Sequence, residues 1–138
     1  MTHPQALHRN SNAVYRLVYH LVLVTKYRKA VFTGEMVSRC GAILGDLCST
    51  WGGTLLECSG EGDHVHGLLD LPPKVRPSDV VNNIKTVTSR RLRAEFPALR
   101  AAYRGKPVLW SPSYCILSAG GAPIEVLKRY IEAQDRPS

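Results

Sequence analysis

Apolar residues recur along this chain with two periods, and the change from one period to the other predicts its secondary structure. Dense or alternating apolar runs rich in Val, Leu and Tyr predict four strands, at residues 14–25, 54–59, 63–71 and 114–118. Apolar residues three or four apart predict three helices, at residues 35–51, 78–96 and 123–134. Glycine and proline mark the breaks between them, with a turn at 60–62 and a loop at 97–112 that Tyr103 and Trp110 anchor.

The order strand, helix, strand, strand, helix, strand predicts an α+β fold. It is the split βαβ pattern of ferredoxin-like and RRM-like antiparallel sheets, here with an appended C-terminal helix. We expect one domain over residues 1–138, with a flexible N-terminus at 1–12 and the C-terminal helix at 123–135. In such a sheet two helices cover one face. Alternation along the third strand points Val65 at these helices, and His64 and His66 at the opposite face.

The charge of the chain is unevenly distributed. Its formal net charge is +7 and its pI is near 9.5, which favours a polyanionic partner, nucleic acid rather than a membrane. Nine basic and two acidic residues fall between positions 74 and 106, so the whole positive surplus lies there; the alternative interpretation is a solvated surface. A second basic cluster at 26–29 includes Tyr27, which suits stacking on an unpaired base. The residues expected to contact nucleic acid are Lys26, Arg28, Lys85, Arg90 and Arg93.

The cysteine spacing and the apolar runs indicate a cellular location. The four cysteines form no C-x-x-C pair, which is typical of buried thiols in a reducing cytoplasm. The first twelve residues lack the apolar core of a targeting segment, and the apolar run at 17–24 is interrupted by His20 and too short to span a bilayer. We therefore expect a soluble cytoplasmic protein without a membrane partner, in which His20 is a core residue.

His64 and His66 are two apart on a predicted strand, so their imidazoles share one face and can bind one cation. The C-terminal helix can add the amide oxygen of Gln134, and this mixed set of nitrogen and oxygen ligands suits Mg²⁺ or Mn²⁺. On its own, an H-x-H pair also fits two half-exposed polar residues on a sheet. The sequence leaves four choices for a carboxylate that orients an imidazole: Glu57, Glu61, Asp63 and Asp70.

Tyr130 lies one helical turn before Gln134, at the margin of an apolar stripe, and is the candidate nucleophile. A phenol with a pKa near ~10 is a poor nucleophile at neutral pH, so it needs a metal that polarises the target phosphate. The two features together favour phosphodiester chemistry. The alternative for Tyr130 is an anchor at the edge of the core.

These residues stand in motifs that span nearly the whole chain. The chain resembles the small single-tyrosine HUH transposases of bacterial insertion sequences that move as single-stranded DNA. The resemblance is carried by residues 19–28, 78–93 and 110–114, by Gly62-Asp63-His64-Val65-His66, and by Lys128-Arg129-Tyr130-Ile131-Glu132-Ala133-Gln134. Cys115 departs from the family, in which an aromatic residue is common at that position.

The resemblance implies a role for each site residue. His64, His66 and Gln134 would hold the metal while Tyr130 attacks the DNA phosphorus, which forms a 5′-phosphotyrosine link and releases a 3′-OH. Because the link keeps the energy of the broken bond, rejoining needs no nucleotide cofactor. The resemblance also implies a homodimer that recognises subterminal DNA hairpins. Gly120-Gly121 would then be a joint that lets the tyrosine helix complete its own site or its partner's.

Two other functions remain open at this point. One is a non-catalytic module that binds single strands or hairpins on the same sheet, although such modules carry stacking aromatics where His64 and His66 stand. The other is a domesticated relative that acts on chromosomal palindromes. The DNA beside the gene distinguishes a mobile element, which hairpins flank, from a domesticated copy, whose target hairpins are scattered. When bound to DNA, the protein is expected at the bacterial nucleoid.

Overall fold

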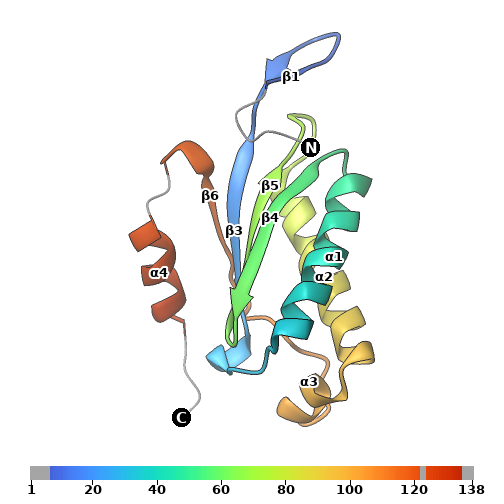
Figure 1. Ribbon diagram of the computed structural model, residues 1–138, viewed down its shortest axis with the longest axis vertical. Coiled ribbons are helices and arrows are strands. Elements are labelled where there is room, and N and C mark those ends of the chain that lie inside the picture. Colours follow the sequence, from blue (N-terminus) through green and yellow to red (C-terminus); the bar gives the residue numbers. More distant parts are fainter. Residues whose placement is uncertain (1–6, 122–123, 135–138) are drawn as a thin grey trace.

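The computed structural model describes residues 7–121 and 124–134, which build a four-stranded antiparallel sheet (Figure 1). The strands lie in the order β4 (Thr54–Glu61), β5 (His64–Asp70), β3 (Val18–Val24) and β6 (Cys115–Ser118). Each neighbouring pair is antiparallel. The first and last strands of the motif therefore lie side by side, which confirms the expected α+β fold with a split βαβ sheet.

Two long helices, α1 (Gly34–Thr50) and α2 (Pro77–Glu95), cover one face of the sheet (Figure 1). The side chain of Thr33 caps α1 by accepting a hydrogen bond from the backbone N–H of Met36. The larger core of the protein lies between these helices and the sheet, and it includes Leu21, Leu23, Val65, Leu69, Ile43, Leu44, Val80 and Ile84. We call this side of the sheet the helix face.

A further helix, α4 (Ile124–Glu132), lies on the other side of the sheet (Figure 1). Its Leu127 is buried against Val22 and Val24 of β3. The partly buried residues around this smaller cluster are Cys115, Leu117, Tyr130 and Ile131. We call this side the histidine face. Val22 and Val24 are the β3 partners of His66 and His64, and directly paired residues share a face.

The turn before β5 differs from the prediction. It was expected at 60–62, but β4 continues to Glu61, which pairs with His64. Gly60 is therefore a strand residue, and a Cβ at this position would lie 2.7 Å from the His64 carbonyl oxygen. The glycine was interpreted as a turn signal, whereas it allows two backbones to approach closely.

The segment expected as a loop at 97–112 begins with a short helix, α3 (Pro97–Ala102), which buries Leu99. A helix of six residues is too short to show a clear period in the sequence, so this prediction was wrong. Tyr103 and Trp110 are both buried, which confirms them as anchors of the segment. Among the described residues, no helix has the length and apolar character needed to cross a membrane.

The N-terminal part of the chain also differs from the prediction. The strand expected at 14–25 is divided, and β2 (Val14–Tyr15) pairs with β1 (His8–Arg9) in a separate two-stranded sheet. His8 stacks on Tyr15 and donates a hydrogen bond of 2.7 Å to the buried carboxylate of Asp70. Part of the segment expected to be flexible is thus held by contacts distant in sequence. Within the ranges predicted for the N-terminus (1–12) and the C-terminal helix (123–135), residues 1–6, 123 and 135 lie outside the described residues.

Candidate active site

The two histidines of β5 lie on the histidine face, as predicted. Val65 between them is buried in the core under α1 and α2, so His64 and His66 point to the opposite side of the sheet. Both imidazoles are half-buried. A group bound on this face can therefore reach them.

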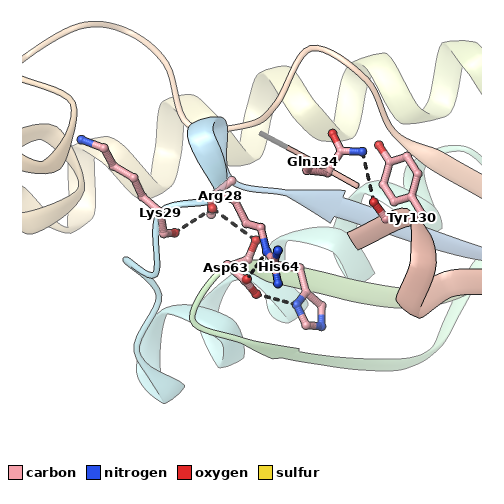
Figure 2. A network of polar contacts seen from close by, with 7 residues as sticks. Arg28, Lys29, Asp63, His64, Tyr130 and Gln134 are labelled. Atoms are coloured by element: carbon pink, nitrogen blue, oxygen red, sulfur yellow. Dashed lines mark hydrogen bonds and ion pairs between the residues drawn. The ribbon is translucent and has the colours of Figure 1, made fainter. Parts of the chain in front are cut away.

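Asp63 fixes the orientation of the first imidazole. His64 donates a hydrogen bond from Nδ1 to the carboxylate of Asp63 at 2.8 Å, which leaves Nε2 as the ligand atom (Figure 2). The same carboxylate accepts a hydrogen bond from Nε of Arg28 at 3.0 Å. Burial alone would raise the pKa of Asp63, but the contacts with His64 and Arg28 lower it overall, so the carboxylate is charged at neutral pH. Asp63 is the orienting carboxylate that sequence could not single out.

The second imidazole has a partner that the sequence analysis missed. His66 Nε2 and His20 Nδ1 are 2.8 Å apart, and the two rings stack with their centres 5.1 Å apart. His20 was expected to be a core residue, but it is half-buried on the histidine face. Burial and the neighbouring imidazoles lower the pKa of His66, which keeps it neutral and able to donate an electron pair to a metal.

Helix α4 brings Tyr130 to the same face. Tyr130 packs beside Val22 and Val24, which are the β3 partners of His66 and His64. The candidate nucleophile and the two candidate ligands therefore lie over neighbouring strands within a single chain.

The hydroxyl of Ser113 connects Tyr130 with Gln134. The Tyr130 hydroxyl lies 2.8 Å from that of Ser113, and burial raises the pKa of Tyr130 above its usual value. Gln134 Oε1 accepts hydrogen bonds from Ser111 at 3.1 Å and from Ser113 at 3.2 Å. Gln134 Nε2 donates to the Tyr130 carbonyl at 3.2 Å (Figure 2). The structure thus brings together the two residues of the predicted C-terminal pair.

Lys85 of α2 holds the segment that carries these serines. Its Nζ donates to the carbonyl oxygens of Ser111, Pro112 and Ser113 at 2.9, 3.0 and 3.4 Å, and burial lowers its pKa. Lys85 was predicted to project from the basic helix towards nucleic acid. In the structure, three carbonyl groups accept hydrogen bonds from its ammonium group, which makes Lys85 an anchor for residues 111–113. No sequence signal indicates this role, because the partners are backbone atoms. The contact of Lys85 with nucleic acid stays a prediction.

The other residues predicted to bind nucleic acid occupy different surroundings. Lys26 lies over the ring of Tyr27, with Nζ 5.3 Å from its centre, whereas Arg28 is half-buried against Asp63. Arg90 is exposed, and Arg93 donates a hydrogen bond from Nε to the hydroxyl of Ser89 at 3.1 Å.

The glycines predicted as a joint lie in a short 3₁₀ turn, η2 (Ala119–Gly121). A Cβ at Gly120 would meet nothing within 4 Å, so packing does not require glycine at this position. Residues 122 and 123, which connect the turn to α4, lie outside the described residues. The role of Gly120 and Gly121 as a joint therefore stays a prediction.

The side chains on this face fit a divalent cation. Ligand atoms of Glu61, Asp63 and His64 all lie within 4.8 Å of one another, and His66 adds a neutral imidazole on the same face. Carboxylate and amide oxygens with imidazole nitrogens are ligands that Mg²⁺ and Mn²⁺ accept. His64 is shared by this cluster and by the predicted set of His64, His66 and Gln134.

Comparison with known proteins decides the family. The model of the family described as "Transposase IS200 like" matches residues 13–134. The chain belongs to the IS200-like transposase family. The transposase TnpA of ISDra2 from Deinococcus radiodurans is 34% identical over 131 residues, which cover 95% of this chain and 93% of the relative. The transposase of insertion sequence IS200 from Salmonella typhimurium is 34% identical over 102 residues, covering 74% of this transposase and 66% of that one.

Solved structures agree with the assignment. The crystal structure of a transposase from Deinococcus radiodurans R1 matches with a TM-score of 0.86 at 33% identity, covering 94% of this chain and 99% of the other. A REP-associated tyrosine transposase bound to a REP hairpin matches with a TM-score of 0.51 at 11% identity, and the match covers 90% of this chain and 69% of the other. The second likeness concerns the fold alone. Membership of the family implies that this transposase is a DNA strand transferase.

Proposed function

We propose that this transposase cleaves and rejoins single-stranded DNA at the ends of an insertion sequence, with Tyr130 as the nucleophile. One observation carries the proposal: α4 packs Tyr130 beside Val22 and Val24, which are the β3 partners of His66 and His64. A phenol and two imidazoles on one half-buried surface are the groups that a metal-assisted attack on a phosphodiester requires.

In the cleavage step, the Tyr130 oxygen attacks the phosphorus and forms a phosphotyrosine bond to the 5′ side of the break. The P–O3′ bond breaks, and the leaving oxygen takes up a proton to become a 3′-OH. The Tyr130 hydroxyl loses its proton, and the Ser113 hydroxyl at 2.8 Å holds the oxygen in place while it does so. Rejoining reverses these changes when a 3′-OH attacks the phosphotyrosine.

His64, His66 and Gln134 would hold Mg²⁺ or Mn²⁺. The ion would polarise the phosphate, so that a phenol could attack it at neutral pH. Asp63 orients His64 through its hydrogen bond, and the lowered pKa of His66 keeps that ring neutral. Gln134 Oε1 accepts hydrogen bonds from Ser111 and Ser113. To coordinate a metal, the Gln134 side chain must rotate away from these hydroxyls, or its Oε1 must coordinate the metal while it still accepts their hydrogen bonds.

The proposed substrate is a single strand with hairpin ends. A REP hairpin is bound by the relative of similar fold, and the net charge of +7 suits a DNA partner. Exposed Arg90 and the partly exposed Arg93 are candidates for phosphate contacts. We further propose a homodimer at the bacterial nucleoid, with Gly120 and Gly121 as the joint that lets α4 dock on its own subunit or on its partner.

The experiment mixes the protein with a labelled single-stranded oligonucleotide from the flank of its gene, in Mn²⁺ or in EDTA. A denaturant-resistant complex is expected in Mn²⁺ and not in EDTA. Tyr130→Phe should abolish this complex and leave DNA binding intact, because only the hydroxyl is lost. The matched control is Tyr15→Phe, which removes a hydroxyl from the distant β1–β2 hairpin. A complex that survives in Tyr130→Phe would refute the proposal.

His64→Ala and His66→Ala sharpen the metal assignment. Each removes one imidazole from the histidine face, so each should lower adduct formation by more than about tenfold while hairpin binding persists. Thr54→Ala is the matched control on the same sheet, since Thr54 is exposed on β4. Tight binding that needs no metal and never yields an adduct would favour the non-catalytic module instead.

A further inference from the structure

The turn after β3 has an unusual backbone. In η1 (Lys26–Arg28), Tyr27 and Arg28 have φ angles of +60° and +55°. Residues other than glycine rarely adopt this left-handed conformation, and it persists only where the surroundings enforce it. Such outliers concentrate at functional sites, so this turn is a candidate for a function.

Hydrogen bonds on both sides of Tyr27 enforce the conformation. The Thr25 hydroxyl donates to the Lys29 carbonyl at 2.7 Å, and the Tyr103 hydroxyl donates to the Lys26 carbonyl at 2.8 Å. The contact between Arg28 and Asp63 adds a third restraint (Figure 2). None of these contacts uses the side chain of Tyr27.

Tyr27 is 51% exposed, although hydrogen bonds hold the turn that carries it. A structural anchor would be buried, as Tyr103 is at 4%. The ammonium of Lys26 lies 5.3 Å from the centre of the Tyr27 ring. An exposed aromatic ring with an adjacent cation is the combination that binds unpaired bases of single strands.

Tyr27 borders a hollow of about 360 Å³ that extends to the candidate active site. Lys26 and Tyr27 line it from η1. Ser113 lines it from the segment of residues 111–113, and Gln134 lines it from just after the end of α4. Ser113 is the hydrogen-bond partner of Tyr130. The volume is at the lower end of the range of roughly 300–1,000 Å³ for small-molecule sites, so a single nucleobase fits better than a larger group.

Tyr27 and Lys26 also border a second hollow, of about 250 Å³, which Arg104 and Lys106 line. Both of these cations are exposed. A strand that passes from one hollow to the other therefore crosses the ring of Tyr27 and meets positive charge beyond it, where its phosphates gain favourable contacts.

We propose that Tyr27 stacks on an unpaired nucleobase of the DNA strand next to the phosphate that Tyr130 attacks. The base occupies the hollow between η1 and residues 111–113, and the backbone continues towards Arg104 and Lys106. Tyr27 is thus a positioning residue, which places the scissile phosphate without touching the reacting atoms. This inference rests on the proposed function, because it assigns a subsite next to the proposed nucleophile.

The test measures binding rather than cleavage. It uses Tyr130→Phe protein and a labelled single-stranded oligonucleotide from the gene's flank, in which one abasic site is moved along the strand a nucleotide at a time. The same scan is run with Tyr27→Asn added, because asparagine tolerates the left-handed backbone and lacks the ring. Tyr27→Phe, which keeps the ring, is the matched control.

We expect one abasic position to weaken binding by about tenfold in the protein with Tyr27 or Phe, and by less than about twofold in Tyr27→Asn. If each abasic position weakened DNA binding equally in the Tyr27 and Tyr27→Asn proteins, the proposed stacking contact would be overturned. The adduct assay with the unmodified protein is run separately. If no adduct forms but one abasic position still weakens binding only when the Tyr27 ring is present, the proposed chemistry is refuted and the base site is supported.

Discussion

The helix face and the histidine face of the sheet differ in how they are held together. On the helix face, α1 and α2 bury Ile43, Leu44 and Ile84 against β3 and β5 in one continuous apolar core. On the histidine face, α4 is held by a small cluster around Leu127 and by hydrogen bonds of serine hydroxyls. The first arrangement specifies the fold, whereas the second leaves polar groups available for chemistry.

This difference indicates how a chain of 138 residues supports both a fold and the surface that carries the candidate active site. Burying α1 and α2 on one side supplies most of the apolar contact, so the other side can carry imidazoles and a phenol at the cost of weaker packing. The free energy of local opening differs between regions of a protein, and functional elements belong to the less stable regions. We therefore expect α4 to open more readily than the rest of the protein.

The largest effect is expected from the helix face. Ile84→Ala removes a side chain that is 0% exposed between α2 and the sheet, and should lower the free energy of unfolding by about 2–5 kcal/mol. Urea denaturation followed by circular dichroism measures this loss. Asn82→Ala, at an exposed position of α2, is the control and should change the stability little. A loss below about 1 kcal/mol for Ile84→Ala would contradict the contrast between the faces.

A smaller and local effect is expected from the histidine face. Leu127→Ala removes the central contact of α4 with Val22 and Val24, and should weaken the docking of α4 by about 2 kcal/mol. Hydrogen exchange should increase at the amides of α4 while those of β3 and β5 keep their protection. Lys128→Ala, next in sequence and exposed, is the control. Equal loss of protection in α4 and β5 would show that the two faces unfold together.

Lys85 connects the two faces, because it reaches from α2 to the segment that holds Tyr130 and Gln134. Lys85→Met keeps the apolar stem and removes the three carbonyl contacts, so we expect a loss of about 1–2 kcal/mol in stability. Adduct formation should fall more than DNA binding. Lys74→Met removes the same charge at an exposed position and controls for electrostatics. Equal reductions in DNA binding by both variants would instead assign Lys85 to a DNA contact.

The smallest effect is expected at the outer surface of the helix face. Arg39 donates two hydrogen bonds to Glu95, and this pair connects α1 to α2. The hydrogen bond from Arg39 lowers the pKa of Glu95, so its contribution is present above the usual pKa of a glutamate and is lost as the pH falls. Both groups are exposed, so Arg39→Gln should change the stability too little for urea denaturation to resolve. A clear loss at neutral pH would show that ion pairs support this face.

Long periodic segments made most of the fold predictable. The helices α1 and α2 and the alternation along β5 follow from apolar spacing, because each is long enough to repeat its pattern. The short elements were not predictable. Neither α3 nor β1 repeats a period, and β1 depends on contacts of His8 with Tyr15 and Asp70 that lie far along the chain.

The candidate site also contains some residues that the sequence predicts and others that it does not. The groups proposed to react, such as His64 and Tyr130, stand in recognisable motifs, and the structure places them on one face of the sheet. Their supporting groups could not be found in the sequence. His20 meets His66 only through the pairing of β3 with β5, and Ser113 meets Tyr130 only when α4 folds back. Pairings of this kind depend on tertiary structure rather than on local pattern.

The central strand β3 has a consequence for how this transposase can evolve. Leu21 and Leu23 point into one core while Val22 and Val24 point into the other, and all four are at most 1% exposed. No position in this stretch is therefore free to vary without disturbing one layer or the other. Adaptation to a new DNA target must therefore come from residues outside this stretch, such as exposed Tyr27 in the turn that follows β3.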